Sequence, residues 1–242
     1  MSLPNVNIVL GNGNMGAVTL SDDGISGLIL TGTAVAGKLE LNRAYVLGST
    51  LDLVKLGIDE KNNPFLYKEL MAYYAAAGEG AELHLLVVSE STTLTQICAN
   101  DAASPLKKLV NSAAGRIRLV GINRNTPAEY TPTKEKGLDK DVITAIAAAN
   151  VVAEGFLAAI APFRILLPAI GWDGSTDALY QPREGSYNRV GVVLASDGKF
   201  GASKLYSAAV GQVLGNELSG VKFSARIPKG AVDCTHFRSP AS

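Results

Sequence analysis

The residues whose types and spacing most clearly suggest ligand binding form a glycine-rich segment near the start of the chain. Residues 32–38 read GTAVAGK and follow a strand-like run, so they match the G-x-x-x-x-G-K pattern of a phosphate-binding loop. In such loops the next residue is Ser or Thr, because its hydroxyl binds Mg²⁺, whereas here it is Leu39. The helix that should begin there is reduced to the short segment GKLELNRA. These two departures argue against a phosphate site. The function that the pattern still offers as an alternative is that of a small α/β nucleotide-binding protein or enzyme that uses the loop from Gly32 to Lys38.

A second glycine pattern, GNGNMG at residues 11–16, has the spacing of a dinucleotide-binding turn. That chemistry needs a helix directly after the glycines, because the pyrophosphate lies at a helix N-terminus. Here the chain continues as AVTLSDDG, which contains β-branched residues and a turn signal. We therefore interpret the pattern as a turn that joins two strands.

Other side chains that could do chemistry are few. The chain has two histidines, and His84 alternates with apolar neighbours, which predicts a position on the surface of a strand. Asp139 and Asp141 stand where a helix begins, a position that favours acidic residues. Asp173 and Asp177 lie in the turn-like GWDGSTD, beside which Trp172 is expected to anchor the loop. We therefore predict no catalytic residue, no metal site and no cofactor.

Composition narrows the class of protein further. The charges of the 22 basic and 22 acidic side chains cancel. The chain therefore lacks the excess of basic residues that would indicate a nucleic acid partner. Cys98 is in an apolar segment and Cys234 in a polar tail, which argues for unpaired thiols. The first residues lack the features of a signal peptide, and the apolar run at 142–163 contains Glu154 and many alanines. We expect a packed helix there, no membrane span, and a soluble protein that stays intracellular when it is made.

The spacing of apolar residues, caps and turn residues predicts a mixed α/β (α+β) fold, a layered sheet with flanking helices and an extended N-terminal strand. We divide the chain into a strand arm with a small αβ unit (1–90), an α/β core (91–215) and an irregular tail (216–242). Two polar stretches, 123–138 and 171–189, are predicted to be exposed loops. The predicted strands are residues 6–10, 25–30, 44–47, 83–88, 117–122, 164–170 and 190–194, and the predicted helices are 64–77, 93–99, 104–115, 139–161 and 203–214.

Apolar and glycine motifs recur along the chain in a fixed order. They read GISGLILTGTAVAG (24–37), VLGSTLDLVKLG (46–57), MAYYAAAGEGA (71–81), LHLLVVS (83–89) and, later, VGVVLAS (190–196). In this order the chain resembles the sheath proteins of contractile bacteriophage tails and related contractile injection machines. The resemblance covers about residues 5–215.

The resemblance implies a structural subunit without catalytic residues that self-assembles as a helical or ring-like homo-oligomer around a tail tube protein. Such a protein is made in the bacterial cytoplasm and ends in a virion tail or injection particle. Sheath subunits are linked by strands lent to the sheets of neighbouring copies. The candidate for this linking strand, beside the extended run at 25–30, consists of Asn5, Val6, Asn7, Ile8, Val9 and Leu10. Sheath proteins continue into a further C-terminal region, where this chain has only residues 216–242.

Overall fold

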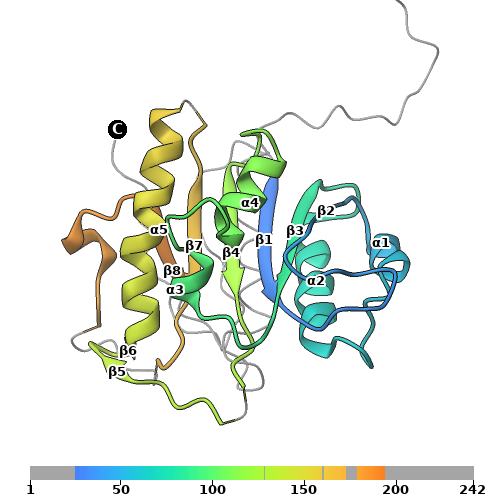
Figure 1. Cartoon of the computed structure of the whole chain (residues 1–242), viewed down its shortest axis with the longest axis horizontal. Helices are drawn as coiled ribbons and strands as arrows, with labels where there is room; N and C mark the ends of the chain where they lie inside the picture. The colour runs from blue at the N-terminus through green and yellow to red at the C-terminus, as the bar shows by residue number, and fades with distance from the viewer. Residues whose placement is uncertain (1–24, 128, 160, 173–178, 194–242) are drawn as a thin grey trace, which may run out of the picture.

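The main sheet in the described part of the chain has six strands in the order β2-β3-β1-β4-β7-β8 (Figure 1). The structure is a computed structural model that describes residues 25–127, 129–159, 161–172 and 179–193. A separate two-stranded sheet pairs β5 with β6. The strands are β1 (Ser26–Thr31), β2 (Ala44–Leu47), β3 (Leu83–Val88), β4 (Leu119–Asn123), β5 (Lys134–Glu135), β6 (Leu138–Asp139), β7 (Arg164–Pro168) and β8 (Val190–Val193).

Five of the six strands in the main sheet run parallel, and only the edge strand β2 is antiparallel to its neighbour. Taken in chain order, the parallel strands follow the spatial order 2-1-3-4-5, which is that of a doubly wound α/β fold. Parallel strands are covered on both faces, so they are apolar throughout and not alternating. The sequences SGLILT of β1 and LHLLVV of β3 are buried at every position. The predicted α/β class, with a layered sheet and flanking helices, is confirmed.

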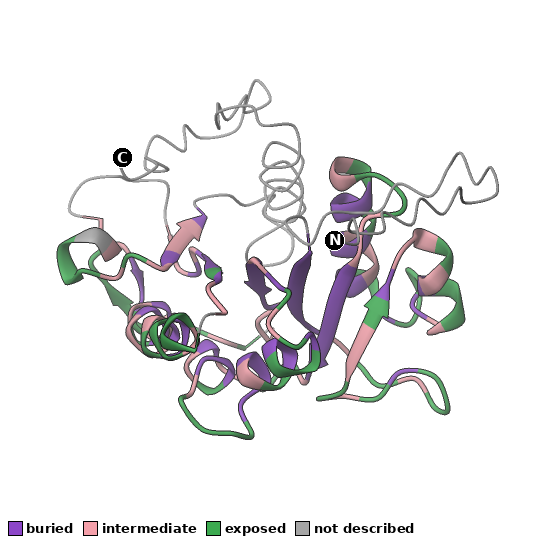
Figure 2. Cartoon of the chain, turned by 90° about the horizontal axis from the view of Figure 1, so that it is seen from above, coloured by how far each residue is buried: buried purple, intermediate pink, exposed green. Residues whose placement is uncertain are grey.

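Helices lie on both faces of this sheet. Seen from above, α2 covers one face, and α3, α4 and α5 lie on the other (Figure 2). Each face has its own apolar core, one built around α4 and α5 and one around α2. The helices are α1 (Thr50–Lys55), α2 (Pro64–Ala77), α3 (Leu94–Ile97), α4 (Pro105–Ser112), α5 (Lys140–Ala158) and the short 3-10 helix η2 (Pro182–Gly185).

The local signals that begin the helices act largely as the sequence predicts. The side chain of Ser104 accepts the backbone N–H of Lys107 at the start of α4, and Pro105 occupies the first helical position. Thr93 and Gln96 form a capping box on α3. The Asp139 carboxylate accepts the N–H of Asp141 at the start of α5.

Helix α5 is long and apolar enough to cross a membrane by length and composition alone, and it is the only such helix in the described part of the chain. That is weak evidence, because core helices of soluble proteins pass the same test. Its residues Val142, Ile146, Ala149 and Ala153 are buried in the core beside the sheet. The helix therefore packs as the predicted core helix does.

Three predictions need correction. His84 is not a surface residue but buried, because its position in β3 is covered on both faces of the sheet. The predicted exposed loop 123–138 starts with the buried residues Asn123 and Arg124, and its last part belongs to the β5–β6 pair. No helix follows Lys38, since the chain turns directly into β2.

The two predicted parts on either side of residue 90 contribute to the same sheet, because β1 pairs with β3 on one side and with β4 on the other. Several predictions lie outside the described residues. They concern the strand at 6–10, the glycine turn at 11–16, Asp173 and Asp177, the helix at 203–214, the tail at 216–242 and Cys234.

Candidate functional site

The polar residues of this protein gather at the edge of the sheet where β1, β3 and β4 end. In doubly wound sheets this edge is the usual ligand position, at the point between the first strand and the strand where the order reverses, here β1 and β4. The backbone N–H of Asn125, just after β4, donates to the Thr31 hydroxyl at the end of β1 (2.7 Å). The two strand ends are therefore already bridged by the chain itself.

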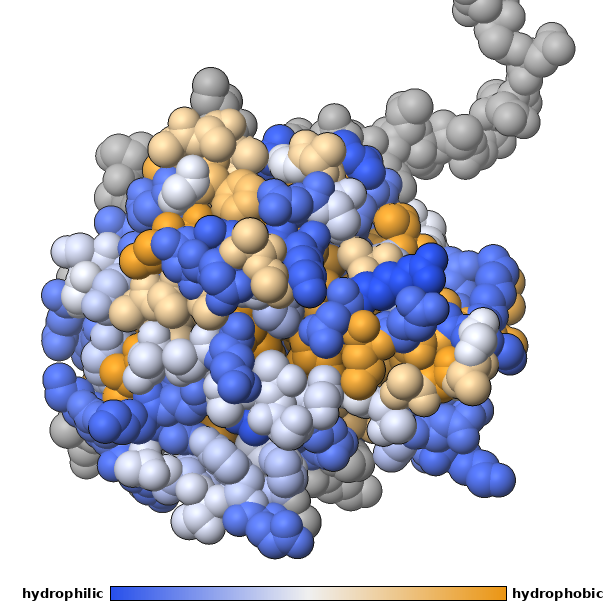
Figure 3. Space-filling view, viewed as in Figure 1, coloured by the Kyte–Doolittle hydropathy of each residue, from blue (hydrophilic) through white to orange (hydrophobic). Residues whose placement is uncertain are grey.

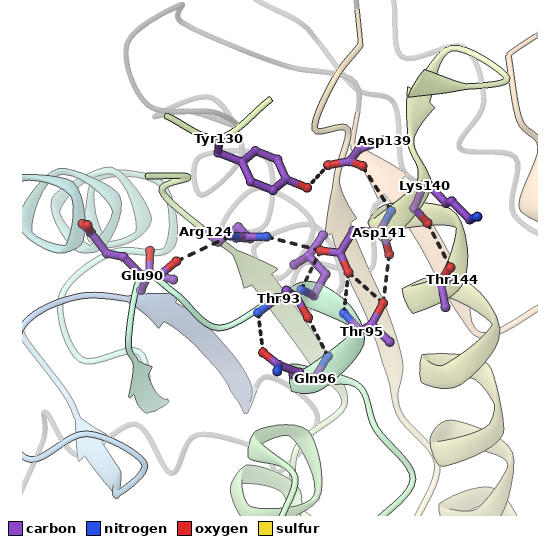
Figure 4. Close-up of polar contacts among 12 residues, drawn as sticks. Glu90, Thr93, Thr95, Gln96, Arg124, Tyr130, Asp139, Lys140, Asp141 and Thr144 are labelled. Carbon is purple, nitrogen blue, oxygen red and sulfur yellow. Dashed lines mark hydrogen bonds and ion pairs between the residues drawn. The ribbon is translucent and has the colours of Figure 1, made fainter. Parts of the chain in front are cut away.

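Arg124 is the centre of this edge (Figure 4). The residue is 1% exposed, and its Nη1 lies 3.3 Å from an Asp141 carboxylate oxygen. Its Nη2 lies 3.5 Å from the carbonyl oxygen of Glu90, and its guanidinium carbon lies 5.0 Å from the centroid of the Tyr130 ring. Its Nε has no hydrogen-bond partner among the described residues. Because a buried guanidinium is costly unless paired, the ion pair with Asp141 decides whether this arrangement is stable.

Asp141 has more partners than Arg124. Its carboxylate also accepts the backbone N–H groups of Leu94 (2.8 Å) and Thr95 (3.0 Å) and the Thr95 hydroxyl (2.7 Å). These groups belong to the first turn of α3, so the carboxylate stands at a helix N-terminus, where a negative charge is favoured. Asp141 therefore ties α5 to both α3 and β4.

Asp139, two residues earlier, completes the network. Its carboxylate accepts the Tyr130 hydroxyl as well as the N–H of Asp141. Burial, together with the hydrogen bond to the Asp139 carboxylate, raises the pKa of Tyr130 to about 12. The network thus consists of acids and a base that bind one another, and no nucleophile in it stands beside a free base. Among the described residues, no group of three His, Cys, Asp or Glu side chains could hold a metal ion.

The glycine-rich loop that follows β1 uses its backbone N–H groups within the chain. A phosphate loop leaves these groups free to bind phosphate oxygens. Here the N–H of Gly32 donates to the carbonyl of Val88 (2.9 Å), and that of Thr33 to the Asn63 side chain (2.7 Å). The N–H of Val35 donates to the carbonyl of Leu39 (2.9 Å).

Asn63 explains why this loop is held so tightly. It occupies the N-cap position before α2, but its side chain makes no cap hydrogen bond to the helix. Instead its amide accepts from Thr33 N–H and donates to the Thr33 carbonyl (3.0 Å). A Cβ on Gly32 would lie 3.0 Å from both Asn63 Oδ1 and a methyl of Val87. The glycine is therefore required by close packing inside the protein.

The edge of the sheet formed by β2 and α1 exposes apolar side chains. Val46 is 62% exposed on β2, and Leu51 and Val54 are each 70% exposed on α1. We call these three residues the β2–α1 surface. Figure 3 shows orange, hydrophobic surface among blue side chains on the right-hand part of the molecule, where Figure 1 places β2 and α1. Among the described strands, β2 pairs only with β3.

The β2–α1 surface is held in place by polar contacts. Ser49 and Asp52 form a capping box at the start of α1, and the hydroxyl and N–H of Thr50 donate to the Glu79 carboxylate (2.7 and 2.9 Å). Leu53 on the opposite side of α1 is buried. This surface was not predicted from the sequence, although one signal was present. Three of the six residues in TLDLVK are apolar, and a short helix with one buried face cannot bury all three.

The predicted linking strand, Asn5 to Leu10, lies outside the described residues. Its predicted place beside residues 25–30 can be examined from the sheet, however. Because β1 has a strand on each side, no further strand can pair with it. The outer strands of the described sheet are β2 and β8.

Two buried side chains away from this edge, His84 and Cys98, could react in principle, but the first is hydrogen-bonded and the second is a disfavoured thiolate. His84 Nε2 lies 2.9 Å from a Glu82 carboxylate oxygen, which also binds Arg116 at 2.9 Å. Burial works to raise the pKa of Glu82, but the hydrogen bonds from His84 and Arg116 outweigh it and the pKa is lowered. Burial raises the pKa of the Cys98 thiol far above its usual value, so the reactive thiolate is disfavoured.

A sequence model of the family described as "DUF2586, N-terminal domain" matches residues 3–217, which is most of the chain. No curated protein matches the chain.

Proposed function

The chain belongs to the DUF2586 family, and we propose that it is a structural subunit that self-assembles around a tail tube, as sheath subunits of contractile bacteriophage tails do. In this proposal the protein is not an enzyme. It is made in the bacterial cytoplasm and becomes part of a phage tail or a contractile injection particle. The ordered motifs that resemble sheath proteins support it, and so does the surface that one of those motifs forms.

The observation that carries the proposal is the β2–α1 surface. The sheath-like motif at residues 46–57 contains all three of its residues, Val46, Leu51 and Val54. A motif needed only for the core would bury its apolar residues, whereas this one leaves them in water at a sheet edge. Burying one such side chain against a partner contributes roughly 1–2 kcal/mol, given that full burial is worth about 1.5–3 kcal/mol. Exposed apolar residues beside an edge strand are typical of a surface that binds another protein.

The linking strand Asn5–Leu10 extends the same proposal. Val6, Ile8 and Leu10 alternate with Asn7 and Val9, so one face of an extended strand would be entirely apolar. Strand addition needs a sheet edge, and we assign the acceptor to an outer strand of a neighbouring copy. The strand β2 is favoured over β8 because Val46 offers an exposed apolar contact next to it.

The test measures assembly of the purified chain by light scattering and negative-stain electron microscopy across protein concentration. The variant Leu51→Glu/Val54→Glu places two charges on the β2–α1 surface, and we expect it to abolish rings, tubes or higher oligomers. The control Lys140→Glu changes the net charge by the same two units at an exposed position on α5, and we expect normal assembly. Deletion of residues 1–10 should also prevent assembly while the core remains folded.

Two outcomes would overturn the proposal. The unmodified chain could remain monomeric at every concentration, alone and with an added tail tube protein. Alternatively, the double glutamate variant could assemble as well as Lys140→Glu does, which would remove the role of the β2–α1 surface.

A further inference from the structure

Three neighbouring strands of the main sheet each begin at an arginine. Arg118 directly precedes β4, Arg164 is the first residue of β7, and Arg189 directly precedes β8. Because these strands are parallel, their starts lie at one edge of the sheet, opposite to the edge that holds Arg124. The N–H of Arg164 donates to the carbonyl of Arg118, and the N–H of Ile165 donates to that of Arg189 (both 2.9 Å). We call Arg118, Arg164 and Arg189 the arginine row.

The positive charge of the arginine row is only partly neutralised. Arg164 is exposed, and it forms no ion pair with a described residue. Arg118 donates from Nη1 to the carbonyl of Gly115 (2.8 Å), which is a neutral partner. Arg189 lies 3.8 Å from a carboxylate oxygen of Glu154, which is a long ion pair. Three cations and one paired acid leave two uncompensated positive charges among the described residues of this edge.

The ends of the helices account for only part of this arrangement. Cations are favoured near helix C-termini, and Arg118 and Arg189 lie beside the ends of α4 and α5. Arg164 does not follow this rule. Alternate residues of a strand point to the same side, so Arg164 shares the side of Leu166, whose core contains α2, whereas α5 packs on the opposite side. The arginine row therefore reaches both sides of the sheet edge.

We propose that the arginine row binds an acidic helix of a partner protein. A guanidinium group suits a carboxylate because it can form two parallel hydrogen bonds with it. Neighbouring strands are about 5 Å apart, so the row extends over about 10 Å. On a helix, residues i and i+7 are about 10.5 Å apart along the axis, and residue i+4 lies between them on the same face. Acidic residues at i, i+4 and i+7 would therefore match the three strand starts.

Other occupants fit the arginine row less well. A DNA-binding surface contacts about six to ten phosphates, whereas the row has three arginines and the whole chain has no net charge. A second copy of this chain offers no matching helix in its described part, because α1 and α2 each carry one acidic residue, α3 and α4 none, and α5 only Asp141 and Glu154. The partner is therefore a different protein.

The inference goes beyond the proposed function and does not rest on it. The β2–α1 surface lies at the β2 end of the strand order, whereas the arginine row belongs to β4, β7 and β8. Loss of self-assembly would therefore leave binding at the row unchanged, and loss of binding at the row would leave the proposed assembly surface intact.

The experiment measures binding of a labelled, alanine-based helical peptide to the full chain by fluorescence anisotropy. The peptide carries glutamates at i, i+4 and i+7, and a second peptide carries glutamines at the same positions. We expect the glutamate peptide to bind and the glutamine peptide not to bind. Binding should weaken when the ionic strength is raised from about 0.05 to 0.5 M, because salt screens exposed charges.

Substitutions locate the site. Arg164→Gln should weaken binding about three- to fivefold, and Arg164→Lys should restore only part of it, since lysine keeps the charge but not the paired donors. The matched control is Arg43→Gln. Arg43 is also exposed and also directly precedes a strand, but β2 is antiparallel, so Arg43 lies at the opposite edge, and binding should not change. Equal urea midpoints of both glutamine variants and the parent show that the fold is intact.

Three results would overturn the inference. The unmodified chain could fail to bind the glutamate peptide, or it could bind both peptides equally well. Arg43→Gln could weaken binding as much as Arg164→Gln does. Stronger binding of single-stranded DNA or of phosphatidylserine vesicles than of the glutamate peptide, lost in Arg164→Gln, would overturn the assignment of a protein helix as the ligand.

Discussion

Breaking the ion pair between Arg124 and Asp141 should lower the free energy of unfolding by an amount that depends on which partner is removed. At 3.3 Å the attraction is of the order of 4–5 kcal/mol at the effective dielectric constant usual for proteins. It offsets the cost of burying both charges. Removing one partner leaves the other charge buried, and that generally costs about 3–5 kcal/mol.

Which of the two substitutions costs more depends on the contacts that the remaining charged side chain keeps. In Arg124→Met, the Asp141 carboxylate still accepts two backbone N–H groups and the Thr95 hydroxyl. In Asp141→Asn, Arg124 keeps only the Glu90 carbonyl and the Tyr130 ring, and an amide group faces it in place of a carboxylate. We therefore expect Asp141→Asn to lower the free energy of unfolding by about 3–5 kcal/mol and Arg124→Met by about 1–3 kcal/mol.

Urea unfolding followed by the fluorescence of the single tryptophan, Trp172, measures both values. Trp172 packs against the core beside α5, so its emission reports on this part of the fold. The matched control is Lys55→Met, which removes a cation from an exposed ion pair with Asp52 (2.6 Å) and should cost less than about 1 kcal/mol. An Arg124→Met cost equal to or larger than that of Asp141→Asn would refute the reasoning, as would a cost of either below that of the control.

Four further expectations concern other parts of the molecule. Burial raises the pKa of Tyr73 from 10.0 to about 12, so the neutral phenol stabilises the fold below pH 10. This stabilisation, roughly 2 kcal/mol, is lost as the pH rises toward 12. Measuring the free energy of unfolding between pH 9 and 12, with Tyr73→Phe as the control, checks it. Lys38→Ala should change the free energy of unfolding by less than about 0.5 kcal/mol because the residue is exposed, and calorimetric titration of the unmodified chain with nucleotide should give no heat of binding. Cys98 should react with a thiol reagent only after urea unfolding in a Cys234→Ser chain, and a fast reaction in the native state would contradict its burial. Leu51→Glu/Val54→Glu should leave the urea midpoint within the error of the parent while assembly is lost, since both side chains are mostly in water.

Local signals predicted most of the fold. Residues 83–88 and 105–112 were correctly assigned because a run with five apolar residues of six and a Ser-Pro helix start have few other interpretations. The position of Asp139 as the cap of α5 was predictable for the same reason. Strand order was not, because nothing local places residues 26–31 in the centre of the sheet, between strands that come about 55 and 90 residues later.

The polar edge of the sheet was the least predictable part. Arg124 follows a strand in a polar segment, which is typical of an exposed loop, and its burial depends on Asp141 from another element. Asn63 had the sequence of a helix cap, but its side chain binds Thr33, thirty residues earlier. Both arrangements have one cause: a polar side chain takes whichever partner the tertiary fold brings to it, and a single sequence does not contain that information.

These contacts also bear on where function can reside. A ligand at the usual position of a doubly wound fold would need the loops after β1 and β4 to present free donors. Thr33 N–H is bound by Asn63, and Asn125 N–H is bound by Thr31. A ligand would have to replace these hydrogen bonds with others of equal strength, and so it would gain little net binding energy. The Asn125–Thr31 bond connects β4 to β1, and the contacts of Asp141 connect α5 to α3 and to Arg124 after β4, so these elements are held together by side-chain bonds. A stiff body with apolar residues at one edge is what a subunit needs in order to hold its neighbours, and the proposed assembly depends on that edge and not on the polar centre.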